Sequence, residues 1–304
     1  MQKQRHRNNM QVLFMKLNGI VNLDMPAAFN QAGSDFRPTI RQGDIMMFSG
    51  PDALPRLMVA PNGARRTTAD HPAIPVTIPD LVDTAAACHA AGAGAMHFHV
   101  RDADQRHVLD AGLYREALAE LEQAVPAMHL QITTEAVGRY SPAQMRQMAL
   151  ALMPPGISIG TIEMIPDRQP LPDDVLLYRA LHEAGTRIQH ILYHPEDVDV
   201  LADLLTAADL PHEAVWCLFV IGHYTGRTSD PALIAPFVDA AAAHGLTADW
   251  AICAFAAEEH DSLAAAVAQG GKLRVGFENS LFMPDGSIAP DNAARVAAAN
   301  RLFG

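Results

Sequence analysis

The feature that most constrains the fold is a regular alternation of short apolar runs and helical stretches, which begins at Arg56 and continues to the end of the chain. The expected strands are residues 57–60, 94–102, 129–133, 157–162, 187–193, 215–221, 250–255 and 272–276. The expected helices are residues 80–91, 111–124, one that begins near 141–142, 172–184, 195–208, 231–244, 258–269 and 290–303. This alternation predicts a parallel sheet with helical crossovers, and eight such units that close on themselves predict an α/β fold of the (β/α)8 TIM barrel type.

An open, doubly wound sheet is the alternative fold for this alternation. It would need a glycine-rich phosphate loop directly after the first strand. Residues 61–65 read Pro-Asn-Gly-Ala-Arg and do not match that pattern. In a barrel, the active site forms at the carboxyl ends of the strands, so the residues just after each strand are the candidates for function.

Residues 1–55 differ from the rest of the chain. Residues 1–9 are basic and polar, residues 10–21 are only mildly apolar, and residues 30–55 are rich in Gly, Pro, Asp and Ser without a stable period. A secretory signal needs a cleaner apolar core and a small-residue cleavage site. We therefore expect an irregular, poorly ordered N-terminal extension at 1–55 and a single metal-binding catalytic barrel at 56–304.

The composition limits the expected partners and the compartment. The formal net charge of −12 disfavours binding to nucleic acid or to an anionic membrane, because both attract basic surfaces. No apolar run in the sequence reaches the ~20 residues that cross a bilayer. Cys88, Cys217 and Cys253 stand singly in apolar runs, so neither a disulfide framework nor a thiolate metal site is indicated. We expect a cytoplasmic protein that acts on small molecules.

Two histidines lie two residues apart in the strand expected at 94–102. A strand points side chains i and i+2 to the same face, so His97 and His99 would converge on one small volume. Neutral imidazole suits zinc and other late first-row cations. The alternative is that the pair consists of two hydrogen-bonded core histidines.

A carboxylate near the other end of the chain can complete this pair. Arg274, Gly276 and Glu278 share one parity, so they point to the same side of the eighth strand. In a closed eight-stranded barrel, the second and eighth strands both flank the first, so Glu278 can reach the two histidines. Two imidazoles and one carboxylate form a catalytic type of metal site with open positions. Alternatively, Glu278 caps a loop or pairs with Arg274 at the rim.

These motifs also carry a family resemblance. The chain contains His97-Phe-His99-Val-Arg-Asp after an Ala-Gly-Ala segment, and Arg274-Val-Gly-Phe-Glu278-Asn near its end. It also contains Ala60-Pro-Asn-Gly-Ala-Arg, Pro75-Val-Thr77, Gln131-Ile-Thr-Thr and Leu281-Phe-Met-Pro-Asp-Gly. With these motifs, the chain resembles the β-keto acid cleavage enzymes from about residue 56 to residue 304.

The resemblance implies a (β/α)8 barrel, usually a homotetramer, that binds one divalent metal, normally zinc. Such enzymes condense a β-keto acid with acetyl-CoA and cleave the adduct to acetoacetate and a new acyl-CoA. By position, the implied metal ligands are His97, His99 and Glu278. The implied catalytic residue is Arg274, and the implied binders of the substrate carboxylate are Thr133 and Ser158. Arg274 would supply positive charge beside a developing oxyanion; a structural salt bridge to Glu278 or Asp102 is its alternative role.

The chain departs from the family pattern at two positions. Asn279 stands where the pattern has an aspartate that acts with the arginine as general base, and an amide cannot accept a proton at neutral pH. Glu135 and His194 are the nearby candidates to take the proton. Arg65 matches a glutamate that faces the amino group of the characterised substrate. We therefore predict a substrate with an anionic or neutral polar tail.

The remaining histidines give weaker indications. His223, with Tyr224 and Arg227, follows the sixth expected strand and could contact the phosphates of CoA, whereas an exposed loop is the alternative. Three other histidines are expected to be exposed to solvent: His107, His182 and His244.

Two other functions remain open. One is a zinc-dependent hydrolase or aldolase-type lyase that does not use CoA. The other is a catalytically altered ligand-binding barrel, because Asn279 removes the expected base.

Overall fold

The structure is a computed structural model that describes residues 53–222, 229–256 and 258–304. Eight strands form a closed barrel in which each strand pairs in parallel with the next and β8 pairs with β1. The strands are β1 (Leu57–Val59), β2 (Ala95–His97), β3 (His129–Thr133), β4 (Gly156–Gly160), β5 (Arg187–Leu192), β6 (Glu213–Ile221), β7 (Thr247–Ala254) and β8 (Lys272–Val275). This confirms the predicted (β/α)8 fold.

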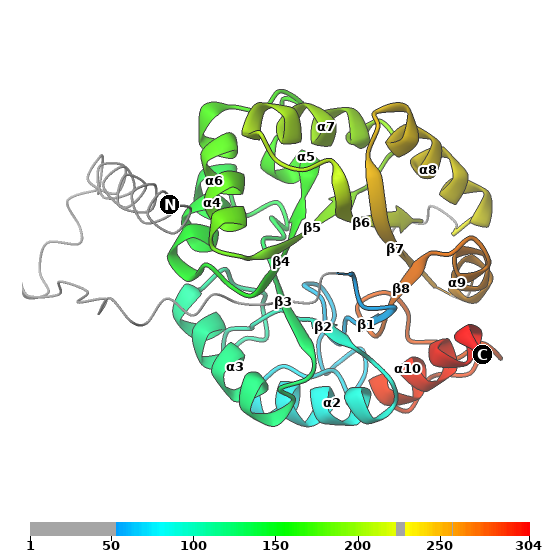
Figure 1. The fold of residues 1–304 in the computed structure, drawn as a ribbon. Helices are drawn as coiled ribbons and strands as arrows, with labels where there is room; N and C mark the ends of the chain where they lie inside the picture. Colours follow the sequence, from blue (N-terminus) through cyan, green and yellow to red (C-terminus); the bar gives the residue numbers. More distant parts are fainter. Residues whose placement is uncertain (1–52, 223–228, 257) are drawn as a thin grey trace, which may run out of the picture. The chain divides into compact units, whose positions relative to one another are not determined.

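Helices surround the strands on the outside of the barrel (Figure 1). They are α2 (Ile78–Ala90), α3 (Ala111–Ala124), α4 (Pro142–Leu152), α5 (Thr161–Met164), α6 (Pro172–Glu183), α7 (Asp197–Ala208), α8 (Ile234–Ala243), α9 (Glu259–Ala268) and α10 (Asn292–Asn300). Among the described residues, two short 3-10 helices accompany them, η2 (Pro231–Leu233) and η3 (Arg301–Phe303). In the part of the chain with described coordinates, no helix combines the length and the apolar character that a membrane span requires.

Local sequence signals explain where helices begin. The hydroxyl of Ser141 accepts a hydrogen bond from the backbone N–H of Gln144, and the side-chain oxygen of Gln144 accepts one from the backbone N–H of Ser141. Pro142 occupies the first turn, where its missing N–H costs nothing. Thr77 and Asp80 form the same reciprocal cap at the start of α2. The predicted start of α4 is therefore confirmed.

Strand parity divides the core into two layers. On β1, Leu57 and Val59 belong to the large apolar cluster between strands and helices, whereas Met58 belongs to a smaller cluster with Trp216 and Leu218. Because successive side chains of a strand point to opposite faces, the smaller cluster fills the inside of the barrel.

Some boundaries differ from the sequence predictions. Leu54, which we placed in the N-terminal extension, is 3% exposed and belongs to the inner cluster. Its amide donates a 2.7 Å hydrogen bond to Oδ2 of Asp249, so the packed barrel includes residues before Arg56. Residues 1–52 lie outside the described residues, and the predicted extension stays a prediction. The strand expected at 157–162 ends at Gly160, because the next residues form α5.

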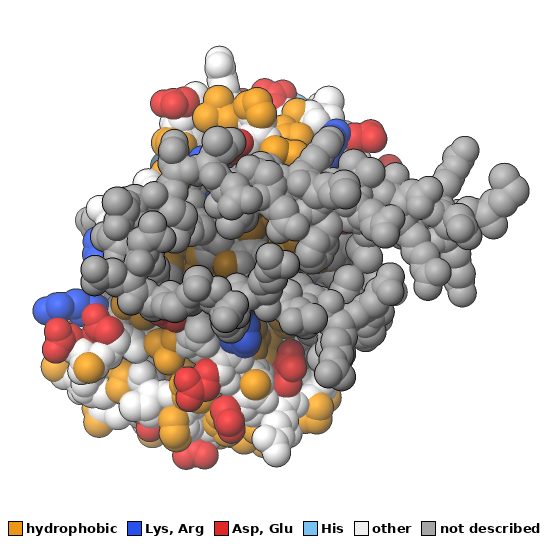
Figure 2. Space-filling view, turned by 90° about the vertical axis from the view of Figure 1, so that its left-hand side faces the viewer, with side chains coloured by type: hydrophobic (Ala, Val, Ile, Leu, Met, Phe, Trp, Pro, Cys, Tyr) orange, Lys and Arg blue, Asp and Glu red, His pale blue; other side chains and the backbone are white. Residues whose placement is uncertain are grey.

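The described surface carries many carboxylates. On the face shown in Figure 2, Asp and Glu side chains are spread over the described surface, with hydrophobic side chains between them. This agrees with the net charge of −12. The three cysteines are buried and free, as the sequence indicated.

Candidate metal centre

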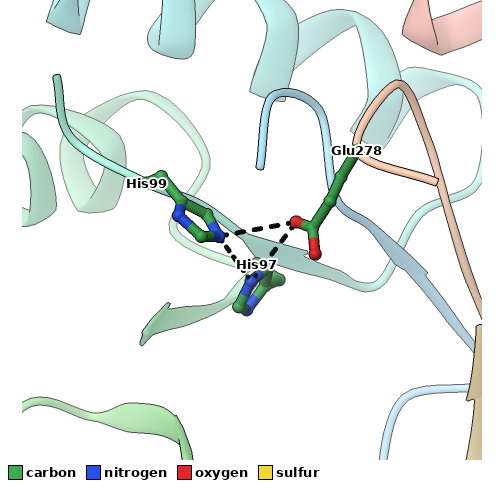
Figure 3. Close-up of side chains that lie close together, drawn as sticks. All are labelled: His97, His99 and Glu278. Atoms are coloured by element: carbon green, nitrogen blue, oxygen red, sulfur yellow. Dashed lines mark hydrogen bonds and ion pairs between the residues drawn. The ribbon is translucent and has the colours of Figure 1, made fainter. Parts of the chain in front are cut away.

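His97, His99 and Glu278 converge at the carboxyl end of the barrel (Figure 3). The two Nε2 atoms are 3.1 Å apart. Oε2 of Glu278 lies 3.4 Å from Nε2 of His97 and 3.5 Å from Nε2 of His99. All three side chains are buried, with exposed fractions of 1%, 0% and 6%.

The barrel topology brings these distant parts of the sequence together. β1 pairs with β2 on one side and with β8 on the other, and Figure 1 shows it between them. His97 ends β2, and Glu278 lies three residues after the end of β8. The carboxyl ends of parallel strands share one rim of the barrel, so both residues reach the same point.

His99 lies beyond the end of β2, where an asparagine side chain holds its backbone. Asn62, which follows β1, accepts a 3.2 Å hydrogen bond from the amide of His99 and donates a 2.9 Å bond to its carbonyl oxygen. The side chain therefore takes the place of a strand partner after β1 has ended. It keeps His99 in the parity that directs its ring towards His97.

Two glycines let the end of β8 approach the end of β1. Gly276 has φ +138°, and a Cβ there would lie 2.3 Å from the carbonyl oxygen of Ala60. Gly63 has φ +60°, and a Cβ there would lie 2.5 Å from Cγ of Glu278. Glycine is the residue that tolerates both the positive φ and the close contact. The space that Glu278 occupies therefore depends on these two positions.

The electrostatic environment gives the three groups the protonation states of metal ligands. Burial lowers the pKa of His97 to about 4 and the pKa of His99 well below its usual value. Burial alone would raise the pKa of Glu278, but the nearby charge of Arg274 and the contacts with both histidines lower it far below its usual value. At neutral pH, the site holds two neutral imidazoles and one carboxylate, and metals bind these forms.

The geometry of the three ligand atoms fits a tetrahedral cation. Zinc bonds of about 2.0–2.1 Å at tetrahedral angles place neighbouring ligand atoms about 3.3–3.4 Å apart. The three observed separations are 3.1, 3.4 and 3.5 Å. When both Nε2 atoms carry lone pairs, the three ligand atoms repel one another at these distances, and a cation between them turns that repulsion into attraction. The residues present therefore fit a divalent metal ion.

Arg274 pairs with the other oxygen of the same carboxylate. Its Nη2 donates a 2.9 Å hydrogen bond to Oε1 of Glu278, and both side chains are buried. The contact leaves Oε2 directed at the histidines. Arg274 also lines the adjoining cavity, so it combines the ion pair with a position in the cavity wall.

A cavity of about 460 Å³ opens beside His97 and Glu278. Its wall is partly polar and partly apolar, and comes from the carboxyl ends of most strands. It is lined by Arg65, His97, Thr133, Glu135, Ile162, Glu163, Ile191, Tyr193, His194, Val220, Cys253, Phe255, Arg274 and Glu278. The volume is in the range of small-molecule sites.

The cavity wall contains two carboxyl groups whose pKa is raised. Burial raises the pKa of Glu135 to about 8, with further contributions from Glu278 and Glu163. Burial also raises the pKa of Glu163. The charge of Arg65 acts in the opposite direction on both groups. Oε2 of Glu135 lies 3.8 Å from Nε2 of His99, which places this carboxyl next to the candidate metal centre.

The other residues singled out in the sequence fall into two groups. Arg65, Thr133 and His194 line the cavity. Ser158 and Asn279 are not among its lining residues: Oγ of Ser158 lies 3.4 Å from Nδ1 of His97, and Asn279 is fully buried. Their assigned roles stay predictions.

Histidines elsewhere test the sequence analysis. His182 and His244 are exposed, as expected. The expectation for His107 was wrong, because it is 1% exposed and contacts His99. The loop after β2 folds back, with a bridge between Arg101 and His107, and no periodic pattern in the sequence signals this turn. His223, Tyr224 and Arg227 lie outside the described residues.

Comparisons with known proteins show the family to which the chain belongs. The model of the beta-keto acid cleavage enzyme family matches residues 56–304. The 3-oxoadipate:acetyl-CoA acetyltransferase of Cupriavidus necator is 24% identical over 249 residues, which cover 79% of this chain and 85% of the relative. The 3-keto-5-aminohexanoate cleavage enzyme of Fusobacterium nucleatum is 24% identical over 246 residues, covering 79% and 88%. The 3,5-dioxohexanoate:acetyl-CoA acetone transferase of Paraburkholderia graminis is 26% identical over 269 residues, covering 78% and 86%.

Solved structures support the fold. A binary complex of ObcA with oxaloacetate matches with a TM-score of 0.63 at 15% identity, covering 76% of this chain and 63% of that chain. The chain thus spans less than two thirds of the length of ObcA. Type I 3-dehydroquinate dehydratase from Clostridium difficile matches with a TM-score of 0.52 at 12% identity, covering 83% and 93%. The family match over most of the chain confirms the resemblance seen in its motifs, and the chain belongs to the β-keto acid cleavage enzyme family.

Proposed function

We propose that the protein is a metal-dependent enzyme that condenses a β-keto acid with acetyl-CoA and cleaves the adduct to acetoacetate and a new acyl-CoA. The observation that carries this proposal is the convergence of His97, His99 and Glu278 next to a cavity that Arg274 also lines. Family membership and the acetyl-CoA-dependent relatives support the choice of reaction.

His97, His99 and Glu278 would hold one divalent metal, which we propose to be zinc. When bound, the metal supplies Lewis-acid stabilisation of negative charge that develops on a carbonyl oxygen. Arg274 adds a second positive charge at the same side of the cavity, because its guanidinium stays protonated at any working pH. Thr133, which ends β3 and lines the cavity, would hold the substrate carboxylate. Ser158, its partner on β4, lies outside the cavity lining and would assist it only through Thr133.

We assign the proton transfer to Glu135. Asn279 is a poor candidate because it is an amide and is buried outside the cavity lining. The carboxyl of Glu135 lies in the cavity beside His99. Without a metal, burial raises its pKa to about 8, which moves it from the usual carboxyl range towards the neutral pH at which a general base works best. His194 also lines the cavity and is the alternative acceptor.

The proposed reaction balances in two carbon–carbon steps. Glu135 takes a proton from the carbon between the carboxylate and the keto group, and this carbon attacks the acetyl carbon of acetyl-CoA. A carbon–carbon bond forms and the CoA thiolate leaves. The thiolate then attacks the original keto carbon, and the bond between that carbon and the deprotonated carbon breaks. The released carbon regains the proton, and acetoacetate departs.

The tail of the substrate would face the part of the cavity that contains Arg65. This positive side chain lines the cavity together with Glu163 and Tyr193. We propose a β-keto acid with an anionic or neutral polar tail, because an ammonium group would meet the guanidinium as a like charge. By family resemblance, the enzyme would work as a homotetramer, and its isolated free cysteines fit a reducing cytoplasm.

A panel of β-keto acids tests the proposal. Purified protein is loaded with zinc and incubated with each acid, with and without acetyl-CoA, and the products are analysed by mass spectrometry. A new acyl-CoA that forms only with acetyl-CoA, and is lost in Glu278→Gln, is the expected result. Cleavage without acetyl-CoA would identify a hydrolase or lyase instead. Zinc binding without turnover of any acid would identify a ligand-binding barrel.

A further inference from the structure

Both candidate metal-binding imidazoles have a buried polar partner on the nitrogen that faces away from the centre. Nδ1 of His97 lies 3.0 Å from Oε1 of Gln131. Nδ1 of His99 lies 3.2 Å from Nδ1 of His107. A neutral imidazole has one N–H and one lone pair, so the partner of one nitrogen decides whether the other can bind a metal.

The partner of His99 is itself fixed by a backbone group. Nε2 of His107 lies 3.2 Å from the carbonyl oxygen of Glu135. A carbonyl oxygen only accepts hydrogen bonds, so Nε2 of His107 carries the proton and its Nδ1 is the acceptor. Nδ1 of His99 must then donate. The lone pair of His99 is left on Nε2, which faces the centre.

A second series of contacts gives the same result for His97. The side-chain amide of Gln189 donates a 3.5 Å bond to the carbonyl oxygen of Cys217. Its oxygen accepts a 3.1 Å bond from Nε2 of Gln131. This orientation turns Oε1 of Gln131 towards His97, so Nδ1 of His97 donates and Nε2 keeps the lone pair. Both glutamines are fully buried.

We propose that these two hydrogen-bond relays, each ended by a backbone carbonyl oxygen, fix the tautomers of the metal-binding histidines. His107 is the positioning residue for His99, and the pair Gln131 and Gln189 positions His97. The relays hold both lone pairs towards the same point before a metal arrives, so binding does not have to reorder protons. The inference rests on the proposed metal site and is independent of the substrate and of CoA.

Metal affinity and ligand-field spectra test the relays. Zinc affinity is measured by competition with a chromophoric chelator, and the visible spectrum is recorded after cobalt(II) substitution. Loss of such outer partners typically costs about 10–100-fold in metal affinity. We expect this loss, with a changed cobalt spectrum, in His107→Leu and in Gln189→Leu. Gln189 contacts Gln131 and not a metal-binding histidine. His107→Gln keeps one donor and one acceptor and should restore most of the affinity.

His129→Leu is the matched control. It also removes a buried imidazole, but from the amino end of β3, where the ring packs edge-on against Trp216 at 5.3 Å. It should keep the wild-type zinc affinity and cobalt spectrum even if it unfolds more easily. If His107→Leu does not fold, then His107→Gln and Gln189→Leu provide the comparison.

The outcomes separate the relays from the metal site. Wild-type affinity and spectrum in both leucine variants, or an equal loss in His107→Gln and His107→Leu, would overturn the role of the relays. A wild-type protein that binds neither zinc nor cobalt would overturn the metal site itself.

Discussion

The backbone of Gly63 lies directly against the side chain of Glu278, so that a Cβ at residue 63 would sit 2.5 Å from Cγ of the glutamate. We expect Gly63→Ala to displace Glu278 and to weaken zinc binding by at least about 10-fold, comparable with the loss of a metal-orienting partner. Chelator competition measures the affinity.

Gly245→Ala is the control for backbone strain. Gly245 has φ +68°, close to the +60° of Gly63, but a Cβ there would meet no atom within 4 Å. Both variants should lose about 1–2 kcal/mol of stability, because both place a side chain in the left-handed region. Equal zinc affinity in the two variants would show that Gly63 is needed only for its backbone conformation.

Glu135 gives a prediction about pH. The proposed base is active only when ionised, and its pKa is about 8 without a metal. A bound cation next to it would lower this pKa, so kcat/KM of the zinc enzyme should rise with pH and reach a plateau below pH 8. Glu135→Gln should reduce kcat by about 10²–10⁴-fold, the usual contribution of a general base, without loss of zinc. A flat pH profile would contradict the role of Glu135, and full activity in this variant would point to His194 instead.

The same carboxyl should also affect stability in the metal-free protein. A raised pKa means that folding favours the neutral form of Glu135. Its contribution to the free energy of unfolding therefore becomes unfavourable as the pH rises from the pKa in the unfolded state, near 4.5, to the pKa in the folded state, about 8. Glu135→Gln should remove this pH-dependent loss. Urea unfolding at pH 5 and pH 8.5 checks it: the stability difference between variant and wild type should be larger at pH 8.5.

The parts of this site that the sequence predicts are those set by period and topology. The shared face of His97 and His99 follows from strand parity, and the approach of Glu278 follows from closure of the barrel, which places β1 between β2 and β8. Strand parity and barrel closure are enough to bring the three residues to one rim of the barrel. The final placement of His99 and Glu278, which lie beyond the ends of β2 and β8, depends on the loops.

The parts that the sequence did not predict depend on irregular segments. The burial of His107 needs the loop after β2 to fold back on Arg101, and the hold of Asn62 on His99 needs the loop after β1 to cross the strand end. Glu163 reaches the cavity because α5 begins immediately after β4, where a continuing strand was expected. These contacts are non-local, and no hydrophobic period encodes them.

Arg65 should control the choice between substrate tails. It lines the cavity, and its charge opposes the rise in the pKa of both Glu135 and Glu163. The charge of Arg65 therefore acts on groups inside the site. We expect Arg65→Glu to lower kcat/KM for dicarboxylic β-keto acids and to raise it for amino β-keto acids, mainly through KM. Arg65→Gln should lose the first activity without gaining the second. A wild-type enzyme that prefers the amino compound would contradict the predicted tail.

Arg274 should make metal binding less sensitive to acid. Its charge is the largest of the contributions that lower the pKa of Glu278, whereas burial raises it. In Arg274→Met, the pKa of the buried carboxyl should rise, and protons should compete with the metal for Oε2 as pH falls. We expect zinc affinity in this variant to fall more steeply between pH 8 and pH 6 than in the wild type. Arg274→Lys keeps a positive charge, so its zinc affinity should fall less steeply than that of Arg274→Met. Parallel affinity curves for all three proteins would show that the ion pair does not hold Glu278 in its metal-binding form.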